Sequence, residues 1–233
     1  MKLLVSVRSV EEALLAADGG ADFIDLKEPG AGALGGLPVA TIREIVAALR
    51  RHRSDLAVSA TIGDVPMHET RRIAACVDAV GACGVDYVKV GIERDPLALE
   101  VLDALAASDW PIVPVFIADR GLDMAHVAHA CALGFPGVMA DTFDKRAGSL
   151  FDVLSMEALR DFVKAVRKGG SIAGLAGALR AMHAPLLHTL DPDFAGFRTA
   201  VCVGDRSTAL DSQRLRALCV LMRGHSAAAL VHA

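Results

Sequence analysis

Short runs rich in β-branched and apolar residues alternate with helical patterns along the chain, and this repetition constrains the fold more than any other feature. Alternating βα units require a parallel sheet with right-handed crossovers. We count eight units, which favour closure of the sheet, so we predict an α/β protein with a single (β/α)₈ barrel of the TIM type. A doubly wound open sheet is the alternative. The predicted strands are Leu3–Val7, Phe23–Lys27, Ala57–Ile62, Tyr87–Ile92, Ile112–Ile117, Val138–Asp141, Ser171–Leu175 and Gly196–Ala200.

Two helical segments show the apolar spacing of an amphipathic helix most clearly. They carry the sets Ile42, Ile45, Val46, Leu49 and Leu159, Phe162, Val163, Val166. The second segment should end at the glycines that follow Lys168. The first helix should begin at Ser9, which stands at capping-box spacing from Glu12.

Length and hydropathy fit one barrel domain over residues 1–224, followed by a tail over 225–233. The composition is 53% hydrophobic and the mean hydropathy is +0.43, which suits strands buried on both faces. It also leaves room for a subunit interface, and we expect a homo-oligomer.

Several function classes are disfavoured. The apolar runs are shorter than the roughly 18 residues of a membrane span, and no signal peptide is evident. A net charge of −4 argues against general nucleic-acid binding. Five scattered cysteines indicate reduced thiols and a cytoplasmic protein. His126 and His129 are close enough on a helix to share a metal, but packing histidines are the favoured interpretation, and we predict no metal and no cofactor.

Ionisable residues stand at the ends of three predicted strands, where barrels build their active sites. Strand alternation turns Asp25 and Lys27 to the side opposite Ile24 and Leu26, so both should enter the barrel mouth. The same alternation turns Lys89 inward. Asp141 ends the sixth strand, and Lys145 follows in the loop.

Burying a lysine ammonium inside a barrel costs free energy unless an anion pairs with it or the reaction needs it. One interpretation is a purely structural network in which the two aspartates neutralise the lysines. The favoured interpretation is catalytic, because neighbouring ammonium groups and burial lower the pKa of a lysine and free its amine to attack a carbonyl.

Glycines follow the seventh and eighth predicted strands, the usual place for phosphate in such barrels. The candidate phosphate-binding residues are Gly177, Ala178, Arg198, Gly204, Asp205 and Arg206. Ordinary turn glycines are the alternative interpretation. The Gly-rich loop over residues 28–36 is a candidate lid.

Ordered sequence stretches along nearly the whole chain are similar to the (5-formylfuran-3-yl)methyl phosphate synthase family of the methanofuran pathway. They are Leu4–Ser6, Gly20–Pro29, Gly32–Gly35, Val58–Pro66, Asp86–Gly91, Asp141–Thr142 with Lys145, Leu150–Asp152, Leu175–Gly177, Gly196–Arg198 and Gly204–Arg206. No single stretch is diagnostic, but their order and spacing together are specific.

The resemblance implies a lyase that condenses two molecules of glyceraldehyde 3-phosphate into a phosphorylated furaldehyde, with loss of phosphate and water. It implies that Lys27 forms a Schiff base, that Lys89 accepts a proton, and that Asp25, Asp141 and Lys145 complete the site. No metal or organic cofactor is implied.

Two other functions are also compatible with these residues. Another Schiff-base aldolase or phosphosugar barrel enzyme would share Lys27 and the phosphate loops. A sensor of phosphorylated metabolites would need affinity but not the inward lysines.

Overall fold

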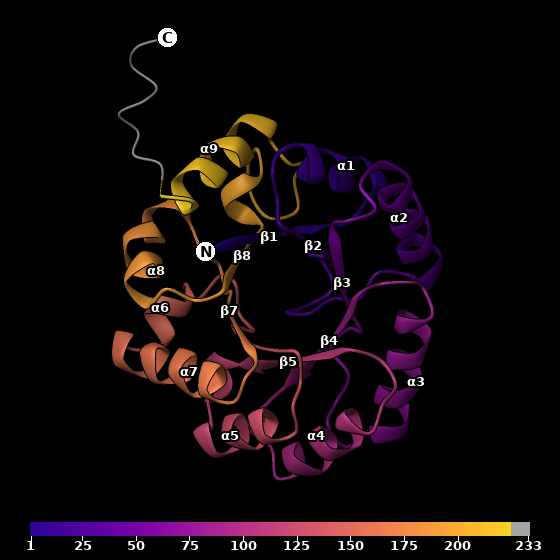
Figure 1. The fold of residues 1–233 in the computed structure, drawn as a ribbon, viewed down its shortest axis with the longest axis vertical. Coiled ribbons are helices and arrows are strands. Elements are labelled where there is room, and N and C mark those ends of the chain that lie inside the picture. The colour runs from indigo at the N-terminus through magenta and orange to yellow at the C-terminus, as the bar shows by residue number, and fades with distance from the viewer. Residues whose placement is uncertain (225–233) are drawn as a thin grey trace.

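The computed structural model describes residues 1–224, in which eight parallel strands close into a barrel (Figure 1). The strands are β1 Lys2–Val7, β2 Phe23–Leu26, β3 Ala57–Thr61, β4 Tyr87–Ile92, β5 Ile112–Ile117, β6 Gly137–Asp141, β7 Ile172–Leu175 and β8 Phe194–Phe197. Each strand pairs with the next in sequence, and Lys2 of β1 pairs with Phe194 of β8. This last pairing leaves no free sheet edge, which confirms the barrel and makes the open sheet wrong.

Helices form a ring around the strands (Figure 1). The ring consists of α1 Val10–Asp18, α2 Val39–His52, α3 Thr70–Gly81, α4 Ala98–Ala106, α5 Met124–Ala132, α7 Met156–Lys168, α8 Ala184–Leu190 and α9 Ser212–Met222. Shorter elements lie in the loops: α6 Leu150–Val153 and the 3₁₀ turns η1 Ala118–Arg120, η2 Ala181–His183 and η3 Thr199–Val201. Within residues 1–224, none of the helices combines the length and the apolar character that crossing a membrane requires.

The periodic apolar residues of the two predicted helices are buried as expected, in α2 and α7. The helix start at Ser9 is also confirmed, because its hydroxyl accepts a hydrogen bond from Glu12 N at 3.2 Å. The Glu12 carboxylate, however, does not complete the capping box. It accepts from Arg8 N at 3.0 Å and faces Arg198.

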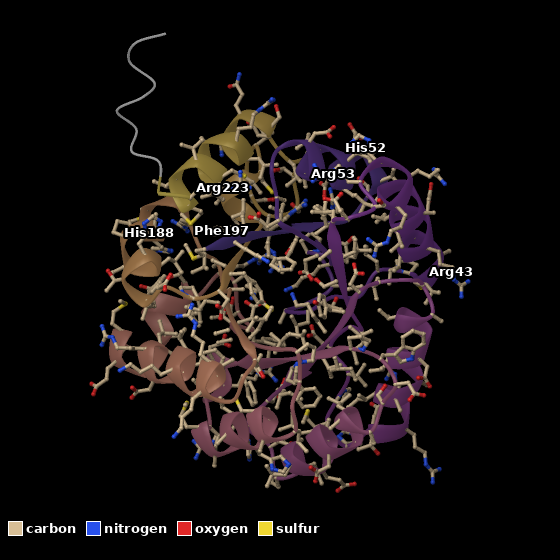
Figure 2. All side chains as sticks on the ribbon, viewed as in Figure 1. Arg43, His52, Arg53, His188, Phe197 and Arg223 are labelled. Carbon is tan, nitrogen blue, oxygen red and sulfur yellow. The ribbon has the colours of Figure 1, made fainter. Side chains whose placement is uncertain are left out.

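Strand alternation divides the apolar residues into two groups, as predicted. Ile24 and Leu26 belong to the core between the strands and the helix ring. A smaller cluster fills the barrel interior, from Leu4, Val113, Val115, Ile117, Met139, Ala176 and Phe194, with Leu34 from the loop after β2. Figure 2 shows side chains occupying the centre of the barrel, with Arg43 and His52 on its outer surface. The ionisable residues described below adjoin this cluster, since Lys89 is aligned with Val113 and Asp141 with Ile117.

The eighth strand was predicted to start two residues and to end three residues too late. It runs Phe194–Phe197, and Phe194 packs against Phe23 inside the barrel with ring centroids 5.4 Å apart. The backbone of Arg198 leaves the extended region at φ −135° and ψ −64°, and η3 follows. Arg198 therefore stands after the strand and not inside it.

The tail predicted over residues 225–233 lies outside the described residues.

Candidate active site

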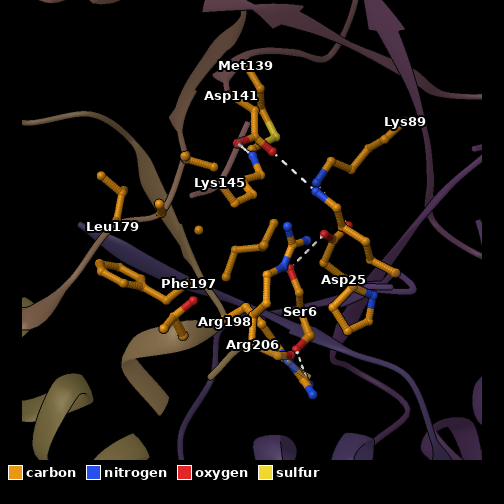
Figure 3. Close-up of a pocket in the computed structure, with 18 residues that line it drawn as sticks. Ser6, Asp25, Lys89, Met139, Asp141, Lys145, Leu179, Phe197, Arg198 and Arg206 are labelled. Carbon is orange, nitrogen blue, oxygen red and sulfur yellow. Dashed lines mark hydrogen bonds and ion pairs between the residues drawn. The ribbon is translucent and has the colours of Figure 1, made fainter. Parts of the chain in front are cut away.

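One pocket opens at the carboxyl ends of the strands and contains most of the predicted site residues (Figure 3). Its predicted members are Asp25, Lys27, Lys89, Asp141, Lys145, Gly177, Ala178, Arg198 and Arg206. Ser6, Leu179, Phe197 and Thr199 also line it and were not predicted, and Pro29 lines it from the loop that was predicted as a lid.

A buried ion pair joins β2 to β4. Lys89 Nζ donates to Asp25 Oδ1 at 2.9 Å. Ser59 Oγ donates to the same oxygen at 2.7 Å, and Ser6 Oγ donates to Oδ2 at 3.1 Å. Burial opposes the charge on Asp25, but the ammonium groups of Lys89 and Lys27 outweigh it and hold the pKa of the carboxyl below its usual value. Asp25 is therefore a fixed anion.

A second carboxylate, Asp141, is shared by two lysines. Lys27 Nζ donates to Oδ2 at 3.3 Å, and Lys145 Nζ lies against Oδ1. Thr142 N also donates to Oδ1, at 2.8 Å. Despite burial, the charges of Lys145 and Lys27 hold the pKa of Asp141 well below its usual range. The two lysine amines are thus bridged by one anion.

The pKa of Lys145 is lowered to about 8. Burial is the main cause, and the charge of Lys27 adds to it, while Asp141 acts in the opposite direction. Three buried lysines meet two buried carboxylates in this site, so full ionisation would leave one positive charge in excess. Loss of a proton from Lys145 removes that excess.

The serines of the Asp25 cluster were detectable from sequence. In the sheet register, Asp25 is aligned with Ser6 on β1 and Ser59 on β3. Both serines therefore point inward near the strand ends, in the same layer as Asp25. The sequence pattern that indicates them is a polar residue at an inward-facing position of a buried strand.

The loops after β7 and β8 form the other wall of the pocket. Gly177 has φ +116° and Ala178 has φ +45°, so the backbone turns sharply there. A Cβ at Gly177 would lie 2.9 Å from the Thr142 side chain, which leaves no space for a larger residue. Within residues 1–224, the N–H groups of Gly177 and Ala178 donate to no protein atom. They are available to an anion.

Arg206 brings a positive charge to the same wall. Its side chain is half-buried, and within the described part of the chain it makes no hydrogen bond or ion pair. Burial lowers the pKa of its guanidinium. A half-buried cation without a carboxylate partner is typical of a site that receives an anionic ligand.

Gly204 and Asp205 do not line the pocket. Gly204 N donates to Thr208 Oγ1 at 2.9 Å, and Asp205 accepts from Ser207 N at 2.8 Å. These two predicted residues shape the loop that carries Arg206. Their direct contact with a phosphate stays a prediction.

The loop over residues 28–36 borders both the pocket and the barrel interior, and its role as a lid stays a prediction. Pro29 lines the pocket and Leu34 is buried in the barrel interior. Asp64 holds the loop, accepting from Ala33 N at 2.8 Å and Leu34 N at 3.0 Å.

Within residues 1–224, no group of three or more histidine, cysteine or acidic residues is arranged to hold a metal. His129 Nε2 instead lies 2.7 Å from Asp103 Oδ1.

The whole barrel is similar to known proteins in sequence. Residues 3–219 match the model of the 4-HFC-P synthase family. The chain belongs to this family. It is 38% identical to the (5-formylfuran-3-yl)methyl phosphate synthase of Methanopyrus kandleri, covering 88% of this chain and 92% of the relative. The synthase of the same name from Archaeoglobus fulgidus is 35% identical, covering 89% and 93%. A Methylorubrum extorquens protein provisionally given this name is 38% identical, covering 95% and 92%.

Solved structures share the fold at lower identity. Phosphoribosyl anthranilate isomerase from Thermus thermophilus superposes with a TM-score of 0.67 at 17% identity, over 96% of this chain and 98% of that one. A 3-hexulose-6-phosphate synthase gives 0.56 at 23% identity, over 94% and 99%. These likenesses concern the barrel and not its chemistry.

Proposed function

We propose that this protein condenses two molecules of glyceraldehyde 3-phosphate to (5-formylfuran-3-yl)methyl phosphate, in the biosynthesis of methanofuran or an analogue. The atoms balance when one phosphate and two molecules of water leave. Family membership supports the reaction, since relatives carry the name of this synthase. The convergence of three buried lysines on two carboxylates carries the proposal, because this chemistry needs an amine nucleophile and separate groups that move protons.

Lys27 is the nucleophile in this proposal. Asp141 bridges its amine to Lys145, whose lowered pKa makes it a suitable acceptor for the Lys27 proton. The neutral Lys27 amine then attacks the triose carbonyl, and loss of water gives an iminium. The iminium withdraws electrons from the adjacent carbon and acidifies its C–H.

Lys89 accepts that proton as a free amine, after its own ammonium has released a proton to solvent. Asp25 orients Lys89 through the 2.9 Å hydrogen bond, and both groups are nearly inaccessible to water. The resulting enamine expels phosphate from the third carbon of the triose and leaves an enol that is nucleophilic at that carbon. This carbon attacks the central carbon of the second triose, which has isomerised to its ketone form. Release from Lys27 by water, closure of the ring and loss of two molecules of water complete the product.

Arg206 and the N–H groups of Gly177 and Ala178 bind the phosphate that is retained. Arg198 lines the pocket as well, but its N–H groups are engaged within the protein. We therefore assign the charged contact with phosphate to Arg206.

The direct test is incubation with glyceraldehyde 3-phosphate, followed by mass analysis of the product and measurement of released phosphate. We expect a furan that absorbs in the ultraviolet and one phosphate per product. A simple aldol product without ultraviolet absorption would favour the aldolase alternative. Binding without turnover would favour the sensor.

Replacing Arg206 with alanine should raise KM more than it lowers kcat. Arg206 contacts the phosphate equally in the ground state and the transition state. Its loss should therefore weaken substrate binding without changing the barrier from the bound substrate. We expect KM to rise by roughly tenfold or more, the scale of a charge-assisted hydrogen bond. Steady-state kinetics measures this, with the exposed Arg160→Ala on α7 as a control. A large loss of kcat at unchanged KM would contradict the assignment.

The rate should rise with pH through the pKa of Lys145. With a pKa of about 8, the neutral fraction of Lys145 grows from about one-tenth at pH 7 to about nine-tenths at pH 9. Because the free amine is the proposed acceptor, kcat/KM should increase about tenfold over this interval. Lys145→Met should be slower and should lose the inflection, whereas the exposed Lys164→Met on α7 should keep it. An unchanged inflection in Lys145→Met would mean that another group titrates.

A further inference from the structure

We propose that the buried Glu12–Arg198 ion pair is a positioning device that holds Arg206 at the phosphate site without touching the substrate. The inference rests on the proposed function of that site. It gives a role to Glu12, which lies outside the pocket, and a different role to Arg198 from the one expected from sequence.

The guanidinium of Arg198 is fully engaged within the protein. Its Nη1 donates to Glu12 Oε2 at 2.5 Å and to Ser6 O at 3.1 Å. Its Nη2 donates to Glu12 Oε1 at 3.0 Å and to Thr208 O at 2.9 Å. Its Nε donates to Arg206 O at 2.9 Å. Every N–H that a guanidinium offers is used, so Arg198 would have to break one of these bonds to contact a ligand.

The hydrogen-bond partners of Arg198 show that it holds the loop that carries Arg206. The segment from Val203 to Ala209 is a loop whose base is closed by Val203 N donating to Ala209 O at 3.0 Å. Within the loop, the carbonyls of Arg206 and Thr208 accept from Arg198, and Ser207 O accepts from Arg8 Nη2 at 2.7 Å. Three successive carbonyls of this loop thus accept hydrogen bonds from Arg198 and Arg8, while the Arg206 side chain lines the pocket.

Glu12 makes this arrangement stable. It lies in the first turn of α1, where the positive end of the helix favours a carboxylate. Its carboxylate is almost buried and pairs bidentately with an equally buried Arg198. Removing one member of a buried pair leaves the other charge uncompensated, so the guanidinium would seek water or another partner. The carbonyls that it holds would then be released, and with them the placement of Arg206.

Glu12→Gln is the test, measured first by calorimetric binding of inorganic phosphate. We expect wild-type protein to bind phosphate, Glu12→Gln to bind it about tenfold more weakly, and the exposed neighbour variant Glu11→Gln to bind as wild type does. In kinetics, Glu12→Gln should raise KM for glyceraldehyde 3-phosphate and change kcat less than about threefold.

Coupling to Arg206 separates positioning from general stability. In the Arg206→Ala background, Glu12→Gln should cause almost no further loss of phosphate binding, because the group that it positions is gone. If Glu12→Gln does not fold, Arg8→Ala removes only the exposed contacts of the device, including the bond to Ser207 O. It should weaken phosphate binding about two- to threefold, again only when Arg206 is present.

Two results would overturn the inference, and they differ from failure of the proposed function. Equal phosphate affinity in wild type and Glu12→Gln would remove the positioning role and leave the phosphate site intact. An equal loss with and without Arg206 would mean that the pair only stabilises the fold. If wild-type protein does not bind phosphate, the proposed site fails and this inference fails with it.

Discussion

Replacing Lys27 with arginine should abolish product formation. Arginine keeps the positive charge beside Asp141, but its guanidinium stays protonated and cannot form an imine in practice. Borohydride added during turnover should attach a reduced triose phosphate to Lys27 of the wild type and inactivate it. Peptide mass analysis locates the adduct, and the ultraviolet assay for the furan measures the rate.

Lys164→Arg on the exposed face of α7 is the matched control, and it should turn over and be trapped at Lys27 as the wild type is. Circular dichroism and thermal unfolding show whether Lys27→Arg is folded, since Lys27 is buried. Substantial activity in Lys27→Arg would assign the residue a role through charge alone. Trapping on Lys89 with none on Lys27 would exchange the two roles, and no trapping on any lysine would remove the imine from the mechanism.

Replacing Lys89 with arginine should stop product formation while leaving trapping at Lys27. Arginine can still pair with Asp25 but cannot accept a proton from the carbon next to the iminium. General-base catalysis contributes about 10²–10⁴ in rate, so we expect a loss of that size. In deuterated water, wild-type protein should exchange the carbon-bound proton of the substrate, and Lys89→Arg should not.

The Lys89 experiment also distinguishes between the two lysines. Lys27→Arg should lose trapping and exchange together, because exchange needs the iminium. Lys89→Arg should lose exchange alone. Normal exchange in Lys89→Arg would transfer the role of base to another group in the pocket, and Asp25→Asn would then be examined in the same way.

Local features of the sequence were sufficient to predict much of the barrel. The spacing of Ile42 and Ile45 identified α2, and Ser9 identified the start of α1. Alternation along β2 placed Asp25 and Lys27 toward the pocket. Each of these inferences depends on a few neighbouring residues, because helix and strand periods are properties of the local backbone. The start of β8 was predicted less well, since barrel pairing and the packing of Phe194 decide it.

The partners of the charged residues were decided by tertiary structure. The sequence indicated that Lys27, Lys89, Asp25 and Asp141 converge, but not that Asp141 bridges Lys27 and Lys145 while Asp25 holds Lys89. It also placed Arg198 and Arg206 together as phosphate ligands. Both line the pocket, but their side chains differ in partners: Arg198 pairs with Glu12, 186 positions away in the chain, whereas Arg206 faces the pocket without a protein partner among the described residues.

The physical reason is that the direction of a side chain depends on neighbouring residues in the sequence, whereas an ion pair depends on segments that are far apart in it. The direction of a side chain follows from its own strand, so the sequence by itself determined which residues face the barrel mouth. An ion pair between distant segments depends on closure of the barrel, on the register of its strands and on which groups lose water together. Only the tertiary structure decided which charged residues pair. It thereby also decided that Lys145 is the lysine with the lowered pKa and that Arg206 is the arginine available to an anion.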